Sequence, residues 1–141
     1  MTLRFWLPGE PVAQARARTG KGFAYYPAKC ANYRKTAALL LRSQYVGQPH
    51  PFGPVVGPVK LGLLFYRVRP KSNKSQWPTV KPDLDNYVKM LCDALMDAGV
   101  LADDSQVCAL NAGKFWVEES SDPSVKFITG PGVEVVLEAL P

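Results

Sequence analysis

Alternation of apolar and polar positions predicts four strands along the chain. Thr2–Leu7 alternates strictly, as a half-buried strand does, and Val59–Val68 is apolar almost throughout, which is typical of a central strand. Gln106–Val117, with an irregularity expected at Gly113, and Val133–Ala139 complete the set. These segments together predict one sheet.

Two other segments carry helical periodicity. Pro27 is well placed to begin a helix that runs to about Tyr45, in which apolar residues recur at helical spacing. The second predicted helix is Asp83–Ala98, ended by Gly99. No repeat, long linker or domain boundary interrupts the pattern. We therefore expect residues 1–141 to form a single α+β domain, with a mixed four-stranded sheet packed with two main helices in two layers.

Composition narrows the possible classes of protein. The 141 residues contain no apolar run long enough for a membrane span or a signal peptide, so we expect a cytoplasmic protein without a membrane partner. The three cysteines, Cys30, Cys92 and Cys108, have no metal-binding spacing. The single histidine, His50, is expected to be an exposed loop residue, which disfavours a Ser-His-Asp or Cys-His mechanism.

Charge is distributed unevenly along the chain. Residues 1–82 hold 14 Lys and Arg and one acid, whereas residues 83–141 hold three Lys and Arg and 11 acids. A basic half of this kind indicates a polyanionic partner. The plainer interpretation is a solvated surface on which the two halves pair their charges, and charge alone does not separate the two.

The stretch from Lys81 to Leu95 carries the candidate chemistry. Its apolar residues repeat at positions i, i+3, i+4 and i+7, as expected for the buried face of a helix. At about 100° per residue, three polar residues fall on a neighbouring stripe that faces away from the core. The apolar residues are Leu84, Tyr87, Val88, Leu91 and Leu95, and the polar residues are Asp85, Lys89 and Asp93.

Asp83 and Asp85 lie at the start of this predicted helix. On a regular helix their side chains would diverge by about 200°, so they converge only if one of them precedes the first full turn. The plainer interpretation is that one caps the helix and the other complements its dipole. After the helix the chain reverses at Gly99–Val107, which returns Asp103 or Asp104 toward one end of the helix. Spacing does not decide which residue or which end.

Three carboxylates from two segments would suit a hard divalent cation such as Mg²⁺, which prefers oxygen ligands. Hydrolysis of a phosphodiester needs what such an ion offers, namely charge neutralisation, an oriented phosphate and an activated water. A nearby lysine could stabilise the negative charge that develops. The plainer interpretation of Asp103 and Asp104 is an ordinary polar turn.

Taken together, these residues resemble the signature of the RusA family of Holliday-junction resolvases. That signature is an Asp-Leu-Asp-Asn run, a lysine, an Asp-Ala-Leu, a glycine turn and an Asp-Asp-x-Gln-Val. The opening of the chain is also similar to that of phage and prophage members, while Tyr87 stands where leucine is commoner. The matching parts are Asp83–Asn86, Lys89, Asp93–Leu95, Gly99 and Asp103–Val107, with Pro8–Pro11, Arg16, Arg18 and Tyr26–Pro27 in the opening.

The resemblance implies a RusA-like fold in which Asp83, Asp85 and Asp104 bind Mg²⁺, with Mn²⁺ as a substitute, and Lys89 is the catalytic lysine. Asn86 and Asp103, like Asp93, are expected to support the site, although helix-surface and turn positions are their plainer roles. Members of the family act as homodimers that cut four-way DNA junctions by paired, symmetric nicks. A two-fold dimer presents two equivalent sites to two equivalent strands.

Phosphate contacts are expected from basic residues in loops that could flank the acidic residues, namely Arg16, Arg18, Lys71 and Lys81. Trp77 could pack in the core or stack on bases. One alternative function is a non-catalytic junction-binding protein of the same fold, against which the presence of all three acids and the lysine argues. Another is a nucleotidyltransferase, but such sites usually open with a Gly-Ser turn where this chain has Lys81 and Pro82.

Overall fold

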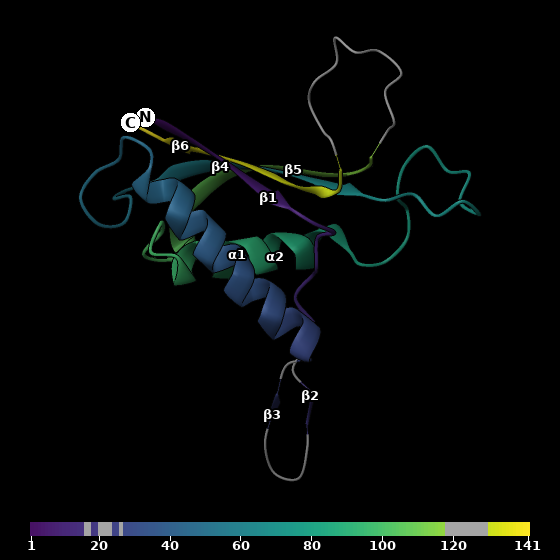
Figure 1. Cartoon of the computed structure of the whole chain (residues 1–141). Coiled ribbons are helices and arrows are strands. Elements are labelled where there is room, and N and C mark those ends of the chain that lie inside the picture. Colours follow the sequence, from purple (N-terminus) through teal and green to yellow (C-terminus); the bar gives the residue numbers. More distant parts are fainter. Residues whose placement is uncertain (16–17, 20–23, 26, 118–129) are drawn as a thin grey trace.

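A four-stranded sheet with two helices on one of its faces forms the body of this computed structural model (Figure 1). The structure describes residues 1–15, 18–19, 24–25, 27–117 and 130–141, and only the backbone of the pairs 18–19 and 24–25. The predicted two-layer α+β arrangement with a mixed four-stranded sheet and two main helices is confirmed.

The predicted strands and helices all form, with small differences at their ends. The strands of the main sheet are β1 (Thr2–Pro8), β4 (Val59–Arg67), β5 (Val107–Trp116) and β6 (Gly132–Ala139). The short strands β2 (Arg18–Thr19) and β3 (Ala24–Tyr25) pair separately. The helices are α1 (Ala28–Val46), α2 (Leu84–Asp97) and the 3₁₀ turn η1 (Asp104–Gln106).

The order of strands in the main sheet is β1-β6-β4-β5, so β4 lies in the interior, as its apolar sequence predicts. It pairs antiparallel with β6 and parallel with β5. Parallel neighbours need a crossover connection, and α2 supplies it between β4 and β5. The start of α2 therefore lies near the end of β4, and the chain returns along α2 to the beginning of β5.

One extra residue interrupts the pairing of β5, but not where the sequence predicts it. The register between β4 and β5 shifts between Val59 and Lys60, so that Cys108 is unmatched on the partner strand. Beyond this bulge Lys114 pairs with Phe65, which is fully buried. Lys114 therefore lies on the face of the sheet that the helices cover.

Gly113, where the irregularity was expected, pairs regularly with Leu64. A Cβ atom at this position would lie 2.8 Å from the ring of Phe115, closer than van der Waals contact allows. The expectation at Gly113 was therefore wrong, because the glycine makes room for an aromatic ring on the same face and does not break the strand.

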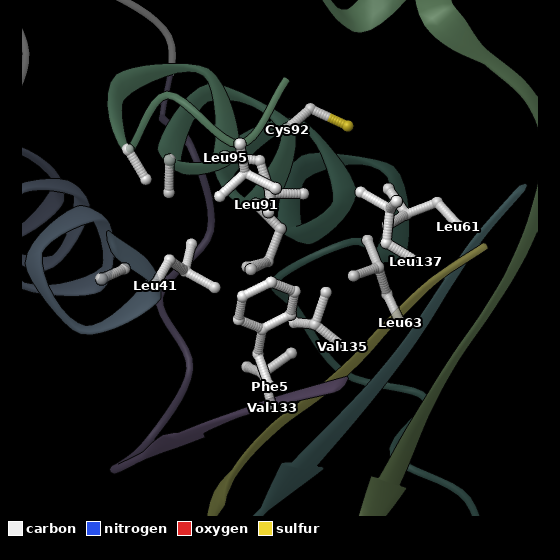
Figure 2. Packing of buried hydrophobic residues seen from close by; sticks show 14 of the residues in the cluster. Phe5, Leu41, Leu61, Leu63, Leu91, Cys92, Leu95, Val133, Val135 and Leu137 are labelled. Atoms are coloured by element: carbon white, nitrogen blue, oxygen red, sulfur yellow. The ribbon is translucent and has the colours of Figure 1, made fainter. Parts of the chain in front are cut away.

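The core lies between the sheet and the two helices (Figure 2). Leucines of α1 and α2 meet the inward residues of β1, β4 and β6, among them Leu41, Leu91 and Phe5. No helix in the described part of the chain is long and apolar enough to cross a membrane.

Burial on α2 is wider than the predicted stripe. Tyr87, Leu91 and Leu95 are fully buried, as predicted, whereas Leu84 and Val88 are only partly buried. The expectation that Asp93 faces away from the core is wrong, because α2 packs against α1 as well as the sheet, and only 6% of Asp93 is exposed. Met90, Cys92 and Ala94 are also buried.

His50 is partly buried, although the sequence predicted an exposed loop residue. Its ring stacks on the ring of Tyr45, with 3.9 Å between the centroids. Tyr45 is fully buried, and its hydroxyl donates a hydrogen bond of 2.7 Å to the carbonyl of Gly53. The histidine thus packs where the loop after α1 returns to the body of the protein.

A buried and an exposed leucine of α1, Leu41 and Leu39, provide a matched test of the core packing. Leu41 is fully buried and Leu39 is 66% exposed. We expect Leu41→Ala to lower the free energy of unfolding by about 2–5 kcal/mol, because the cavity left behind adds to the lost burial. Leu39→Ala should change it by about 0.5 kcal/mol or less. Urea denaturation of both variants checks this, and equal effects would contradict the packing described.

Candidate active site

Asp83 occupies the N-cap position of α2, with an extended backbone (φ −72°, ψ 149°). It therefore precedes the first turn, which is the condition for its side chain and that of Asp85 to converge. The side chain of Asp83 is 56% exposed and makes no capping hydrogen bond. Asp85 lies exposed in the first turn and accepts a hydrogen bond of 3.0 Å from the amide of Asn86. The predicted capping role is thus not filled by the Asp83 carboxylate.

The chain just before Asp83 is held from the sheet. The Lys114 ammonium donates hydrogen bonds of 2.9 Å to the carbonyls of both Val80 and Pro82. Arg67 donates one of 3.2 Å to the carbonyl of Lys81 between them. Sequence reasoning missed Lys114 and Arg67, because bonds to main-chain carbonyls leave no pattern of residue types.

Lys89 joins the two acidic segments. Its ammonium lies 3.0 Å from Asp93 Oδ1 and 3.8 Å from Asp104 Oδ2. The hydrogen bond and the charge of Asp93, followed by the charge of Asp104, raise the pKa of Lys89 above its ordinary value. Lys89 therefore carries a full positive charge at neutral pH, on a side chain that is 54% exposed.

Asp93 is the buried partner in this group. Besides Lys89, the Arg34 guanidinium of α1 lies 3.8 Å from Asp93 Oδ2. Arg34 also forms a two-pronged contact with Asp97, at 2.5 and 2.9 Å. A buried carboxylate is tolerated only when cations and hydrogen bonds compensate its lost hydration, and Asp93 has both. Its place is thus to anchor Lys89.

The turn after α2 separates the roles of the two neighbouring acids. Asp103 caps η1, and its carboxylate accepts hydrogen bonds from the hydroxyl and amide of Ser105, which lower its pKa. Asp104 follows and approaches Lys89 halfway along α2. The return of the chain thus brings Asp104 to the middle of the helix and leaves Asp103 engaged in its own turn.

Gln106 fixes this turn to the rest of the molecule. Its side-chain oxygen accepts hydrogen bonds from the amides of Ala102 and Asp103, at 2.8 and 3.1 Å. Its side-chain nitrogen donates to the carbonyls of Val55 and Gly57, at 2.8 and 3.0 Å. The glutamine belongs to the Asp-Asp-x-Gln-Val signature, but the sequence alone gave it no role.

The predicted metal ligands have the right donor atoms for a divalent ion, but their side chains are not gathered around one point. Asp83, Asp85 and Asp104 offer only oxygen donors, as Mg²⁺ prefers. In the part of the chain that the structure describes, however, no three acidic, histidine or cysteine side chains are placed to hold one metal ion. Asp104 lies near Lys89, and Asp83 lies 3.6 Å from the ammonium of Lys81. The ligand set therefore stays a prediction.

The predicted DNA contacts are placed only in part. Lys81 is 88% exposed, next to Asp83, and Lys71 is exposed in the same loop between β4 and α2. Arg16 lies outside the described residues, and only the backbone of Arg18 is described, in β2. Trp77 is 56% exposed and packs its ring against Phe115, with 5.6 Å between the centroids. The loop before α2 thus offers exposed cations, of which Lys81 lies beside Asp83, and an exposed aromatic ring on the face of the sheet opposite Lys114.

Asn86 contributes to the geometry through its main chain. Its carbonyl accepts a hydrogen bond of 3.0 Å from the amide of Gln14, which ties the N-terminal segment to the first turn of α2. Its side chain is exposed. Support of a ligand by this side chain stays a prediction.

A cavity of about 760 Å³ opens elsewhere, between α1 and the C-terminal end of α2. Arg34, Lys35, Arg42 and Asp97 are among the residues that line it. Asp97 is the last residue of α2 and Asp83 precedes the first, so this cavity lies at the opposite end of the helix from Asp83.

Comparison with known proteins gives two curated relatives and one family. The profile of the family described as Endodeoxyribonuclease RusA matches residues 8–137. A Bacillus subtilis (strain 168) protein named Uncharacterized protein YqaN is 37% identical over 133 residues, which cover 83% of this chain and 89% of the relative. The Crossover junction endodeoxyribonuclease rusA of Lactococcus phage r1t is 41% identical over 58 residues, which cover 40% of this chain and 44% of the phage protein.

Asp93 and Asp97 allow a matched test of the buried anchor. We expect Asp93→Asn to lower the free energy of unfolding by about 1–3 kcal/mol, since it removes charge-assisted contacts to Lys89 and Arg34. Asp97→Asn, on the same helix with a side chain that is 40% exposed, should cost about 1 kcal/mol or less. Chemical denaturation at neutral pH measures both. A larger loss from Asp97→Asn would contradict the anchoring role of Asp93.

The cysteines give a second test. Burial, followed by the charges of Asp104 and Asp93, raises the pKa of Cys92 to about 11, and Cys30 is also buried, whereas Cys108 is exposed. In the folded protein at mildly alkaline pH, we expect a disulfide reagent such as dithionitrobenzoate to modify Cys108 promptly and the other two only after unfolding. Cys108→Ser should abolish the prompt reaction. Prompt reaction of Cys92 would show that α2 is more open than described, and prompt reaction of Cys30 would show the same of the start of α1.

Proposed function

Since this chain belongs to the RusA family of endodeoxyribonucleases, we propose that it resolves four-way DNA junctions by paired, symmetric hydrolysis of phosphodiester bonds. The phage relative is named a crossover junction endodeoxyribonuclease, and the aligned part covers 44% of it, so junction specificity belongs to the proposal. The observation that carries it is the 3.8 Å contact between Asp104 and Lys89. Lys89 lies on α2, the helix that has Asp83 at its N-cap and Asp85 in its first turn.

In this proposal Lys89 is the catalytic lysine. Its ammonium is held at 3.0 Å by the buried carboxylate of Asp93, so its position is set from the core, while its exposed part faces the solvent. A phosphate oxygen that gains negative charge during cleavage would be stabilised by this cation. Because the charge is held in place before the substrate arrives, little reorganisation is needed during the reaction.

We propose Asp83, Asp85 and Asp104 as the ligands of Mg²⁺, with Mn²⁺ as a substitute. When bound, the ion would neutralise phosphate charge and lower the pKa of a water molecule. The carboxylates of Asp83 and Asp104 are 56% and 44% exposed, so their side chains are free to turn toward an ion. The contact of Asp104 with Lys89, at 3.8 Å, is longer than a hydrogen bond and would open readily.

The partners in this proposal are branched DNA and a second copy of the chain. Paired cuts at equivalent strands are most simply made by two equivalent sites, which a two-fold homodimer provides. Lys71 and Lys81, with Arg16 and Arg18, would bind phosphates around the acidic residues. With such a substrate, we propose that the protein acts in the cytoplasm of a bacterial or phage-infected cell.

A junction-binding protein without catalysis, on the same fold, is the second candidate. It is favoured by the separation of the three carboxylates, which are not gathered around one point among the described residues. Lys89 and all three acids would then serve only to shape the surface. A cleavage assay distinguishes the two candidates, because both expect binding and only one expects cutting.

We expect the purified protein to nick a synthetic four-way junction in the presence of Mg²⁺, with paired cuts and little action on linear duplex. Asp85→Asn should lower the cleavage rate about 100-fold or more, the scale expected when one charged group of an active site is lost. It should leave the affinity for the junction nearly unchanged, because the basic loop is intact. Gel analysis of end-labelled junctions, with binding measured in Ca²⁺, checks both effects.

Asp97→Asn is the matched control, since Asp97 is an exposed acid at the other end of the same helix. It should cut like the wild type. Binding of junctions without cutting in Mg²⁺ or Mn²⁺ would favour the second candidate. Equal cutting of linear duplex would remove only the specificity for branched DNA.

A further inference from the structure

We propose that Lys114 is a positioning residue that fixes the chain leading into α2 and so places Asp83, together with Arg67 as its second arm. This inference rests on the proposed function, in which Asp83 is a metal ligand. It adds residues from β4 and β5 to a site that the signature confines to α2 and the turn after it. Lys114 and Arg67, together with the three carbonyls they bind, form a carbonyl clamp.

The clamp holds three consecutive carbonyls. Lys114 binds those of Val80 and Pro82, each at 2.9 Å, and Arg67 binds that of Lys81 at 3.2 Å. These residues lie in the loop between β4 and α2, outside any helix or strand. A charged donor makes stronger hydrogen bonds than a neutral one, so this loop is restrained immediately before Asp83.

The chemistry of Lys114 supports a role beyond packing. It lies on the helix-covered face of β5, where burial and the neighbouring Arg67 guanidinium lower its pKa. Even partial burial of an ammonium is unfavourable, and an apolar side chain of similar length would fill the same space without that cost. The charge is instead directed to two carbonyls, which a leucine or methionine could not bind.

Arg67 is braced by the N-terminal segment. Its Nε lies 3.7 Å from Glu10 Oε1, and Glu10 Oε2 accepts a hydrogen bond of 3.2 Å from the amide of Val68. Glu10 belongs to Pro8–Pro11, the part of the family-like opening to which the sequence assigns no task. The clamp thus joins the N-terminal turn, the end of β4 and the end of β5 to the start of α2.

Restraint of the main chain matters here because the Asp83 side chain is exposed and makes no capping hydrogen bond. Its side chain contacts only the highly exposed ammonium of Lys81, at 3.6 Å, among the ion pairs of the described residues, so its place before an ion binds depends mainly on its backbone. A ligand whose backbone is fixed in advance loses less freedom on binding, which strengthens binding of the ion. Loss of the clamp should therefore weaken the use of Mg²⁺ more than the binding of DNA.

The test compares Lys114→Met with Lys114→Arg, which keeps the donors, and with Lys60→Met as a control. Lys60 is an exposed residue on the opposite face of the same sheet, in β4. The Tyr87 amide donates to the Asp83 carbonyl at 3.3 Å. In the metal-free protein we expect hydrogen exchange of this amide to rise about tenfold in Lys114→Met, the factor for one lost hydrogen bond. In Lys60→Met it should be unchanged, and in Lys114→Arg it should rise less.

In the cleavage assay we expect the Mg²⁺ concentration for half-maximal rate to rise about tenfold or more in Lys114→Met, as for residues that support metal ligands. The dissociation constant for the junction should be unchanged, and Lys114→Arg should restore most of the Mg²⁺ response. Exchange of the Tyr87 amide and a Mg²⁺ response both equal to the wild type would overturn the proposal. So would faster exchange spread evenly over the molecule with an unchanged Mg²⁺ response, which indicates a purely structural role.

Should Lys114→Met fail to fold, Arg67→Met gives the same two measurements with one carbonyl released, and an unchanged result in it overturns the proposal. If the wild type never cuts junctions, the proposed function fails while the exchange measurement still decides whether the clamp holds the start of α2. The two failures are therefore distinguishable.

Discussion

The parallel pairing of β4 with β5 is the constraint on which the rest of the structure depends. Two parallel neighbours cannot be joined by a tight turn, so the chain must travel back before it can pair again. The return path is α2, with one acidic segment just before it and another just after it. Asp83 and Asp104 are therefore brought to the same helix by the topology of the sheet, and Lys89 meets Asp104 because it lies midway along that helix.

Periodicity predicted the strands and helices well because each buries one face, which alternation and helical spacing record directly. It failed for Asp93, since α2 packs against α1 as well as the sheet and a single stripe describes only one contact surface. The candidate acids came from a motif, whereas Lys114, Arg67 and Gln106 could not be found that way. They act on main-chain groups, which every residue carries, so the identity of their partners leaves no trace in the sequence.

The basic residues of the first half of the chain that the structure describes fall into two groups. Part of the basic half pairs with the acidic half, as Arg34 does with Asp93 and Asp97 where α1 meets α2. Another part, including Lys71 and Lys81, stays exposed in the loop before α2. Internal pairing therefore accounts for only part of the basic half, and exposed lysines remain for the polyanionic partner that we propose. The Arg34 pairs lie between the helices, whereas Lys81 is 88% exposed and also lies 3.6 Å from Asp83, just before α2.

The bulge at Cys108 determines on which face of the sheet each later residue of β5 lies. In a strand, neighbouring residues point to opposite faces, so one residue more or less exchanges the two faces. If Cys108 were paired with Lys60 instead of bulged, Phe115 would point toward the helices and Lys114 toward the open side of the sheet. The number of residues in β5 therefore matters to the fold as much as their identity, because it decides which side chains face the helices. A homologous chain that lacks the bulge would have to place its lysine one residue nearer to Val107, the first residue of β5, for the lysine to face the helices.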